Sequence, residues 1–338
     1  MKITNVRAYY AAAPDPDNKA VDDVSLTIGE GEVLGIAGES GCGKSTLASV
    51  MAFTARPPLY VKSGEMELDG EVIHLTAQAE APAYWRGMMV ALLPQRALNS
   101  LNPTARISNF VVDVTRAHND AISPKKAIEN ARQRLEQLTL PPRVLDSYPH
   151  QLSGGMRQRV VAVISTLLNP NLLIADEPTS ALDVSSQKQL VLLLKVLLDR
   201  GFIKRIAFIT HDLPMLSNIA DRIAIMYAGK LVEIGPTQQI VENPRHPYTH
   251  ALITSTLDPE PAVRQHRREG IQGAPPDLRY PPGGCRFHPR CPLAMPICAQ
   301  EEPPPVGTVD DFAACWWVQQ QHGRDTVATA IAAQEAHA

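Results

Sequence analysis

The segment GESGCGKS, residues 38–45, fits the pattern G-x-x-x-x-G-K-[S/T], which cradles nucleotide phosphates. Glycines let the backbone N–H groups of such a loop point inward at phosphate oxygens. The apolar stretch EVLGIAG before it, residues 32–38, predicts a buried strand, and KSTLASVMAF after it predicts a helix. That helix adds its positive N-terminal end to the site. A glycine turn with a solvated lysine is the alternative, but the strand–loop–helix context favours a nucleotide site.

Two side chains of this loop have defined chemical tasks. We expect Lys44 to reach the β- and γ-phosphates of ATP and Ser45 to offer its hydroxyl to Mg²⁺. Cys42 is a small residue that fits the loop, although a thiol exposed there would be open to oxidation. The residues predicted to contact ATP in this segment are Gly38, Glu39, Ser40, Gly41, Cys42, Gly43, Lys44, Ser45 and Thr46.

A second apolar run ends in two carboxylates. The segment LLIADEP, residues 172–178, predicts a buried strand that stops at Asp176 and Glu177. Beside a phosphate loop, Asp176 would hold Mg²⁺ through water, and Glu177 would orient or deprotonate the attacking water. The alternative is a polar strand end that begins a turn, because Asp-Glu-Pro alone is common. The phosphate loop in the same chain favours the catalytic interpretation.

The segment LSGGMRQR, residues 152–159, predicts a second anion-binding helix start. One nucleotide does not need two such helix ends from a single chain. Two chains packed head to tail would use both, because each would lend one end to each of two nucleotides. We therefore expect a dimer that closes on ATP. The residues expected to reach the ATP of the partner chain are Leu152, Ser153, Gly154, Gly155 and Met156.

Composition argues against several classes of protein. The chain has 338 residues, 44 % of them hydrophobic, which suffices for one large core or a core with an appendage. Its formal net charge of −3 predicts no general attraction to nucleic acid. The first ten residues lack the pattern of a secretory signal, and no apolar run is long enough to span a membrane. We expect a chain that lies in the cytosol, where disulfides are rare, and that has no nucleic-acid partner.

Strands and helices alternate along most of the chain, which indicates an α/β sheet. Residues 1–35 predict short strands in a meander, with turns at PDPDNK and GEGE. Further helices are expected at 124–138, 155–168 and 185–200, and further strands at 172–175, 206–210 and 222–235.

The composition changes near residue 258. Twelve of the 29 prolines fall between Pro259 and Pro305, a density that resists regular elements. This stretch predicts a separate, irregular appendage. The last residues, HGRDTVATAIAAQEAHA, predict a frayed helix or a disordered tail.

Four of the five cysteines follow the spacing Cys285-x5-Cys291-x6-Cys298-x16-Cys315. In a reducing cytosol, four thiols so close in sequence fit a metal or iron–sulfur site better than disulfides. The spacing lacks the short C-x2-C pairs of a zinc ribbon, which disfavours zinc. A proline-rich segment with little core of its own would gain stability from such a cross-link. An iron–sulfur cluster, zinc and unliganded packing cysteines are the three interpretations.

Together these motifs resemble the ATP-binding cassette (ABC) proteins, the nucleotide-binding subunits of transporters. The resemblance implies that Gln95 contacts Mg²⁺ and transmits the nucleotide state to a membrane subunit, and that His211 clamps the γ-phosphate. It covers, in the expected order, the phosphate loop at 38–46, Gln95, LSGGM at 152–156, the acidic strand at 172–177, SALD at 180–183 and His211.

The same resemblance completes the expected site. It implies an aromatic residue that stacks on adenine, matched by Tyr10 and less well by Tyr9, and places Asp183 toward the partner's ATP. The implied catalytic residues are Glu177, His211 and Gln95, and the implied Mg²⁺ ligands are Ser45, Gln95 and Asp176.

Three further stretches resemble the ATPase subunits of oligopeptide, dipeptide and nickel importers. They are NSLNP at 99–103, NPRHPYTHAL at 243–252 and GGCRFHPRCP at 283–292. A departure is PQRALN at 94–99, which borders the surface expected to meet a membrane subunit. Some members of this subfamily hold a [4Fe–4S] cluster in the same segment, which implies that Cys285, Cys291, Cys298 and Cys315 are its ligands.

The resemblance also implies the domain organisation of a P-loop NTPase. A nucleotide-binding domain would span residues 1–257, with an N-terminal antiparallel β subdomain and an α-helical subdomain inserted at about 96–158. A cysteine- and proline-rich extension would follow at 258–320, and a tail at 321–338.

The function implied is ATP hydrolysis coupled to solute import at the cytoplasmic face of the inner membrane. The implied partners are a second ATPase subunit, like or unlike, two integral membrane permease subunits and an extracytoplasmic solute-binding protein. Peptides are the default cargo, and nickel and oligosaccharides are alternatives. A soluble ABC ATPase acting on ribosomes or DNA and a redox-sensing regulator are the competing classes; the subfamily stretches count against the former.

Overall fold

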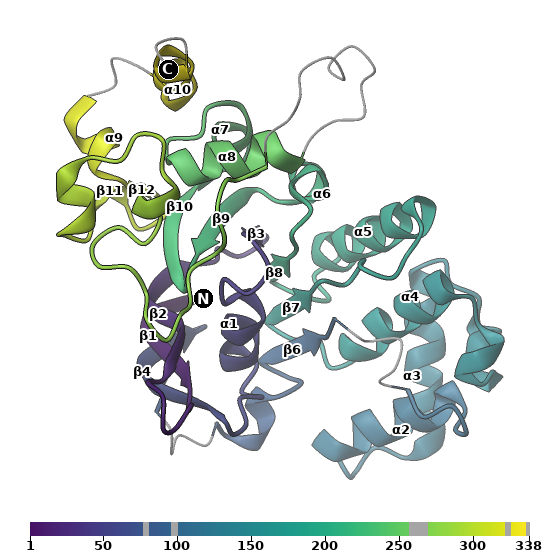
Figure 1. The fold of residues 1–338 in the computed structure, drawn as a ribbon. Coiled ribbons are helices and arrows are strands. Elements are labelled where there is room, and N and C mark those ends of the chain that lie inside the picture. Colours follow the sequence, from purple (N-terminus) through teal and green to yellow (C-terminus); the bar gives the residue numbers. More distant parts are fainter. Residues whose placement is uncertain (77–80, 96–100, 257–269, 322–325, 336–338) are drawn as a thin grey trace.

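The computed structural model describes residues 1–76, 81–95, 101–256, 270–321 and 326–335 (Figure 1). Parts of NSLNP and PQRALN, the proposed boundary near residue 258 and parts of the tail lie outside these ranges. No helix in the described ranges is long and apolar enough to cross a bilayer.

An antiparallel sheet is built largely from the N-terminal residues. In spatial order its strands are β2 (Asn18–Thr27), β1 (Lys2–Tyr10), β4 (Leu59–Leu68) and β5 (Glu71–His74). The expected turn GEGE falls between strands, the last two residues of PDPDNK already belong to β2, and β1 and β2 are longer than the short strands predicted. Register shifts in β1 absorb breaks in the apolar alternation as bulges, so the strand continues through them. The arrangement is not a meander, because β4 pairs with β1.

A second, larger sheet carries the phosphate loop. In spatial order its parallel strands are β9 (Arg222–Tyr227), β3 (Val33–Ala37), β8 (Ile206–Ile209), β7 (Leu172–Asp176) and β6 (Val90–Leu93). Antiparallel strands continue it beyond β9 in the order β10 (Lys230–Pro236), β12 (Asp311–Ala314) and β11 (Pro305–Thr308). Both faces are covered, which explains why the central strands are continuous apolar runs.

Two hydrophobic cores lie on opposite faces of this larger sheet. Alternate residues of β7 show the division, since Leu172 and Ile174 join one core and Leu173 and Ala175 the other. The first core also contains helix α1 (Lys44–Met51) and the inner face of the antiparallel sheet. The second contains most of the remaining helices, so the molecule is a layered α/β fold, as the sequence predicted.

The helices of the second core follow the chain in two groups. One group is inserted between β6 and β7 and lies beyond the β6 edge of the sheet in Figure 1. It consists of α2 (Ile107–His118), α3 (Pro124–Gln137), η3 (Pro142–Asp146), η4 (Pro149–Gln151) and α4 (Gly154–Ser165). The other group consists of α5 (Val184–Asp199), α6 (Leu213–Ile219), α7 (Thr237–Glu242) and α8 (Pro247–Thr256). The short helix η1 (Ala83–Trp85) precedes β6 and belongs to neither group.

Local signals explain several helix ends. The Ser123 side chain accepts a hydrogen bond from the backbone N–H of Lys126, and Pro124 is the first residue of α3, as its fixed φ favours. Helix α2 was not predicted individually, although Ile107 and Val111 are buried and Phe110, Val112 and Val114 also pack against the core.

The C-terminal segment is more regular and more closely attached than the sequence indicated. Residues 305–314 form the β11–β12 hairpin, and β12 pairs with β10. Phe312 and Ala313 are buried there, because the open edge of β10 offers both hydrogen bonds and apolar surface. Shorter elements are η6 (His288–Arg290), η7 (Pro296–Ala299), α9 (Trp316–Gln321) and α10 (Val327–Glu335).

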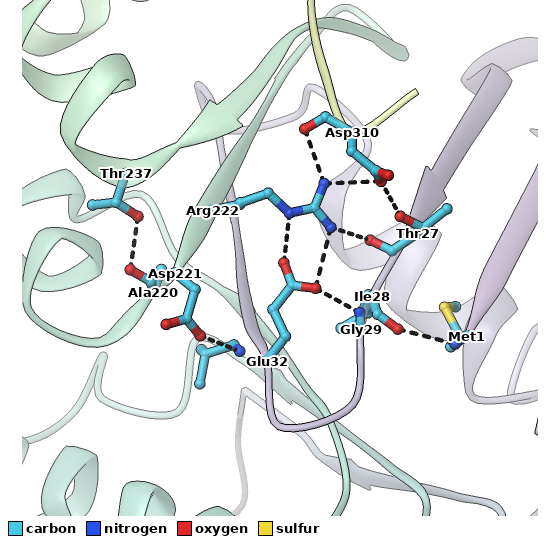
Figure 2. A network of polar contacts seen from close by, with 11 residues as sticks. Met1, Thr27, Ile28, Gly29, Glu32, Ala220, Asp221, Arg222, Thr237 and Asp310 are labelled. Carbon is cyan, nitrogen blue, oxygen red and sulfur yellow. Dashed lines mark hydrogen bonds and ion pairs between the residues drawn. The ribbon is translucent and has the colours of Figure 1, made fainter. Parts of the chain in front are cut away.

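A polar network joins this hairpin to both sheets (Figure 2). At the start of β9, Arg222 donates Nε to Glu32 Oε1 at 2.6 Å and Nη2 to Glu32 Oε2 at 3.2 Å. Its Nη2 also donates to the carbonyl of Thr27, and its Nη1 to Asp310 Oδ1 at 3.1 Å. One guanidinium therefore links the end of β2, the approach to β3 and the turn of the hairpin.

Candidate functional site

The phosphate loop connects β3 to α1 in a conformation that requires glycine. Gly38 has φ 151° and Gly43 has φ 109°. A Cβ on Gly43 would lie 1.9 Å from the carbonyl oxygen of Ala20, and one on Gly38 would lie 2.1 Å from that of Met226. The loop is therefore pressed against β2 and β9, and no side chain fits at either position.

Lys44 is held inside this loop. Its Nζ donates to the carbonyl oxygens of Gly38 at 2.7 Å and Glu39 at 2.9 Å, and contacts Cys42 Sγ at 3.6 Å. Burial raises the pKa of the Cys42 thiol, with partial opposition from Lys44. Cys42 is thus a buried neutral neighbour of the lysine, which argues against the exposed, oxidisable thiol considered from the sequence.

Ser45 and Asp176 meet at the base of the loop. Ser45 Oγ donates to Asp176 Oδ1 at 3.1 Å, although the residues are far apart in the chain. Burial raises the pKa of Asp176, the Ser45 hydrogen bond opposes this, and the neighbouring Glu177 raises it further. A hydroxyl and a carboxylate in contact supply the oxygen ligands that Mg²⁺ prefers.

Gln95, Glu177 and His211 converge beyond the carboxyl ends of adjacent strands. Gln95 Nε2 donates to Glu177 Oε2 at 2.8 Å, and His211 Nδ1 lies 3.0 Å from Glu177 Oε1. They follow β6, β7 and β8, which are neighbours in the sheet. Parallel strands present their carboxyl ends at one edge, and for this reason three residues distant in sequence meet at one carboxylate.

A cavity of about 360 Å³ opens over the loop. Tyr10 lines it, with its hydroxyl 3.2 Å from Thr46 Oγ1. Tyr9 instead is buried and donates to Asp22, so Tyr10 is the better candidate for an adenine contact. The lining residues are Tyr10, Asn18, Ala20, Ser40, Gly41, Gly43, Lys44, Ser45, Thr46, Gln95, Glu177 and Leu278.

Asn18, Ala20 and Leu278 were not predicted to take part in the site. Ala20 supplies the carbonyl against which Gly43 packs, and Leu278 comes from the C-terminal segment. Neither carries a sequence signal, because an alanine in a strand and a leucine in a proline-rich stretch are ordinary structural residues. The long-range folding of the chain alone brings them to the cavity.

The segment 152–156 starts α4 at a separate place. Ser153 is the N-cap, and its Oγ accepts from the Met156 N–H at 3.3 Å. None of Leu152, Ser153, Gly154, Gly155 or Met156 lines the cavity of its own chain. This is the separation that a head-to-tail dimer would require.

Asp183 caps the helix beside this segment. Its Oδ1 accepts from the Ser186 N–H at 3.0 Å and its Oδ2 from the Ser186 hydroxyl at 2.7 Å, and these bonds lower the pKa of Asp183. A Cβ on Gly155 would lie 2.4 Å from Ser186 Oγ. The start of α4 and the start of α5 are therefore in direct contact, and Gly155 permits this close approach.

The four C-terminal cysteines lie near one another. Burial raises the pKa of Cys285 to about 12 and of Cys315 to about 11, and raises that of Cys291 as well. Each of these three pKa values is also raised by charge on other cysteines of the set Cys285, Cys291, Cys298 and Cys315. Every pair in the set interacts in this way. Among the described residues, no three His, Cys, Asp or Glu side chains are close enough to hold a single metal ion.

The fold and the site together define a nucleotide-binding cassette: a P-loop α/β core, an acidic strand end and a Ser-Gly-Gly helix start that does not line the cavity of its own chain. Comparison with known proteins agrees. Residues 21–180 match the family model described as ABC transporter, and residues 232–298 match that of the oligopeptide/dipeptide transporter C-terminal region.

Relatives over nearly the whole chain narrow the family. The Dipeptide transport ATP-binding protein DppD of Caldanaerobacter subterraneus subsp. tengcongensis is 42 % identical over 90 % of this chain and 92 % of its own. The Oligopeptide transport ATP-binding protein OppD of Bacillus subtilis is 39 % identical over 89 % and 84 %. The chain belongs to the ABC transporter family, in the group of oligopeptide and dipeptide transport ATP-binding proteins, and it is an ATPase.

Solved structures support the fold assignment. The structure described as the dimeric structure of MJ0796, a bacterial ABC transporter cassette, superposes with a TM-score of 0.59 at 26 % identity. The superposition covers 70 % of this chain and 98 % of the MJ0796 chain. The predicted fold class is thereby confirmed for the cassette.

Proposed function

We propose that this chain hydrolyses ATP at a two-cassette interface to drive uptake of peptides, or a similar small solute, through separate membrane subunits. The convergence of Gln95, Glu177 and His211 beside the phosphate loop is the observation that carries the proposal. The names of the relatives support peptides as cargo.

The loop binds the triphosphate in this proposal. Backbone N–H groups within residues 38–46 would surround the phosphates, and the Lys44 ammonium, held at the loop carbonyls, would neutralise phosphate oxygens. Ser45, Asp176 and Gln95 would hold Mg²⁺, which neutralises developing charge on the phosphates when bound. Tyr10 contacts adenine at the outer end of the cavity.

Glu177 is the proposed general base. It accepts the proton of the attacking water on a carboxylate oxygen, while Gln95 and His211 hold the carboxylate in place. His211 also reaches toward the γ-phosphate in this assignment. The Glu177 backbone N–H donates to the Ile209 carbonyl at 2.8 Å, so the main chain fixes the base as well.

The second half of each site comes from a partner cassette. Leu152 to Met156 and Asp183 are not among the residues that line the chain's own cavity, and in this proposal a second copy or an unlike subunit would bring them to its ATP. The N-terminal end of α4 would then meet the γ-phosphate with its positive dipole. The described dimer of the solved relative is consistent with this arrangement.

Replacing Glu177 with Gln tests the assigned base. We expect steady-state hydrolysis to fall by roughly a hundredfold or more, since a positioned base contributes about 10²–10⁴. ATP binding and an ATP-dependent dimer should persist in size-exclusion chromatography. Normal turnover in Glu177→Gln would contradict the role of Glu177, and the exposed control Glu136→Gln should behave as wild type.

A groove beside β6 is the proposed contact with a membrane subunit. It has a volume of about 380 Å³, and apolar side chains such as Leu92, Phe110 and Ile164 line much of it. Pro94, next to Gln95, lies at the same groove, so a docked segment would sense the nucleotide site. Copurification with permease subunits at the cytoplasmic face of the inner membrane would support this role, and a Phe110→Asp chain should fail to copurify while keeping its ATP affinity.

We also propose that the four C-terminal cysteines hold a [4Fe–4S] cluster. The burial of these thiols and their electrostatic effects on one another support it, and a four-iron cube is larger than one ion, so its four ligands lie farther apart than those of zinc. The raised thiol pKa values mean that the cysteines are protonated without a cluster and release protons when it binds. The cluster would cross-link the segment.

Anaerobic purification tests this assignment. We expect brown protein containing about four irons per chain, from cluster stoichiometry, and lower iron content in a Cys298→Ser variant. Colourless wild-type protein with four titratable thiols in this segment would exclude the cluster.

A further inference from the structure

A direct contact joins the four-cysteine segment to the phosphate loop. Arg290, which precedes Cys291, donates Nη1 to Glu39 Oε2 at 2.7 Å and Nη2 to Glu39 Oε1 at 3.1 Å. The Arg290 side chain is 5 % exposed and that of Glu39 is 22 % exposed. This is a two-point arginine–carboxylate pair shielded from solvent, which is both strong and directional.

Glu39 is bound to the loop and its surroundings at each of its polar groups. Its backbone N–H donates to the Tyr248 hydroxyl at 2.8 Å, and its carbonyl accepts from Lys44 Nζ at 2.9 Å. Among the described residues, the partner of the Glu39 carboxylate is Arg290, which lies outside the loop. The Glu39 carbonyl also accepts from the Cys42 N–H at 3.2 Å, and Arg290 adds a restraint on the Glu39 side chain from the C-terminal segment.

Arg290 itself is fixed on the other side. Its Nε donates to the carbonyl of Gln272 at 2.9 Å, its Nη2 to that of Ile271 at 3.2 Å, and its Nη1 to the Tyr227 hydroxyl at 3.2 Å. The hydrogen bonds to Glu39 raise the pKa of Arg290, so it stays charged. A guanidinium restrained at every nitrogen transmits position and does not merely neutralise charge.

A residue that precedes the four cysteines in the C-terminal extension also forms part of the cavity wall. Leu278 lines the cavity, and its carbonyl accepts from the Lys19 N–H at 3.1 Å. Two separate points of the C-terminal segment, Arg290 at the phosphate end and Leu278 at the wall, therefore bear on the nucleotide site.

We propose that Arg290 is a positioning residue for the phosphate loop, through which the four-cysteine segment and bound nucleotide stabilise each other. The inference deepens the proposed function and rests on the cavity over residues 38–46 being the nucleotide site. Arg290 holds Glu39 in the binding conformation, so its loss adds a conformational cost to ATP binding. Linkage requires the reverse effect, in which bound ATP restrains the four-cysteine segment.

The effect of Arg290 on ATP binding is tested by measuring nucleotide affinity with fluorescent ATP and Mg²⁺. We expect Arg290→Gln to raise the Kd about tenfold, within the range usual for coupled sites. Arg286→Gln is the matched control, because Arg286 is also a buried arginine of this segment, paired with Asp22 and the Ala228 carbonyl. An Arg290→Gln Kd within about twofold of wild type, or an equal rise in both variants, would overturn the proposal.

Kinetics separate positioning from general damage. Because Arg290 contacts no reacting group, Arg290→Gln should raise the KM for ATP and leave kcat at saturating ATP close to wild type. Arg290→Lys keeps the positive charge but loses the two-point guanidinium contact, so its KM for ATP should be intermediate. If Arg290→Gln fails to fold, Glu39→Gln breaks the same pair from the loop side and should reproduce the KM effect. A loss confined to kcat in these variants would refute the assignment.

The reverse effect is read in the cysteine segment itself. Hydrogen–deuterium exchange at residues 285–298 should be slower with MgATP in wild type and unaffected by MgATP in Arg290→Gln. No ATP protection in a wild type that binds ATP normally would sink this proposal alone. A wild type that fails to bind ATP would sink the proposed function instead.

Discussion

Single residues at the site adopt backbone conformations that their neighbours enforce. Glu177 has φ 43°, a left-handed conformation that costs a non-glycine residue about 1 kcal/mol or more. Its N–H bonds to Ile209 and its carboxylate meets Gln95 and His211, so the surrounding contacts offset that cost. Strain at this residue is consistent with the catalytic role proposed for it.

His246 provides a residue-scale prediction on pH. Complete burial lowers its pKa from 6.5 to about 3, its Nδ1 accepts from the Tyr248 N–H, and its Nε2 has no hydrogen-bond partner in the described ranges. The unfolded chain binds a proton below pH 6.5 that the folded chain refuses. Stability is therefore full above pH 6.5 and falls by about 1.4 kcal/mol per pH unit toward pH 3.

Urea unfolding at pH 7.5 and 5.5 measures this effect. In His246→Asn, whose side-chain oxygen can still accept from Tyr248, the loss of stability between the two pH values should be about 1 kcal/mol smaller than in wild type. An identical loss in both proteins would show that His246 is not the titrating group.

At the scale of elements, the amphipathic pattern of α5 determines which side chains carry stability. Leu190, Leu194 and Leu197 are fully buried against the sheet and α4, whereas Leu192 is 62 % exposed. Sequence periodicity predicted this helix correctly, because 3.6-residue spacing and burial agree along its length.

Two leucines of α5 make a matched pair of variants. Leu194→Ala should lower the free energy of unfolding by about 3 kcal/mol, through lost burial and the cavity left behind. Leu192→Ala removes the same atoms from an exposed position and should change stability little. Equal destabilisation in chemical denaturation would mean that the helix packs by a different face.

At the scale of the whole molecule, one guanidinium on β9 joins two segments that are far from it and from each other in sequence. Arg222 links Glu32, Thr27 and Asp310, and so connects both sheets with the C-terminal hairpin (Figure 2). The Arg222 and Glu32 side chains are 16 % and 14 % exposed. Removing one partner of such a pair leaves the other charge poorly solvated.

Arg222→Ala should therefore destabilise the protein by roughly 3 kcal/mol. Arg279→Ala, which breaks the exposed pairs with Asp15 and Asp277, should have a thermal transition close to that of wild type. Similar melting temperatures for Arg222→Ala and wild type would show that the network does not hold the hairpin in place.

Local chemistry was predictable because it depends on neighbours in the chain. The residue types of 38–45 and 172–177 identify the phosphate loop and the acidic strand, and the spacing of Pro124 and its neighbours identifies α3. The roles of Gln95 and His211 came only from the family resemblance, because a lone Gln or His carries no local signal. Strand order then explains why they reach Glu177.

By itself the sequence determined the α/β class, the phosphate loop and the carboxylates, since backbone conformation and apolar periodicity act over short stretches. Only the tertiary structure decided that Leu278 borders the cavity, that Arg290 holds Glu39, and that the hairpin at 305–314 extends the main sheet. These contacts join residues that are more than seventy positions apart in the sequence. The pair Phe312 and Ile234 has the smallest separation among them. The partners of such residues depend on which strand edges and charged groups remain unpaired once the core has folded. A local sequence pattern contains no information about that.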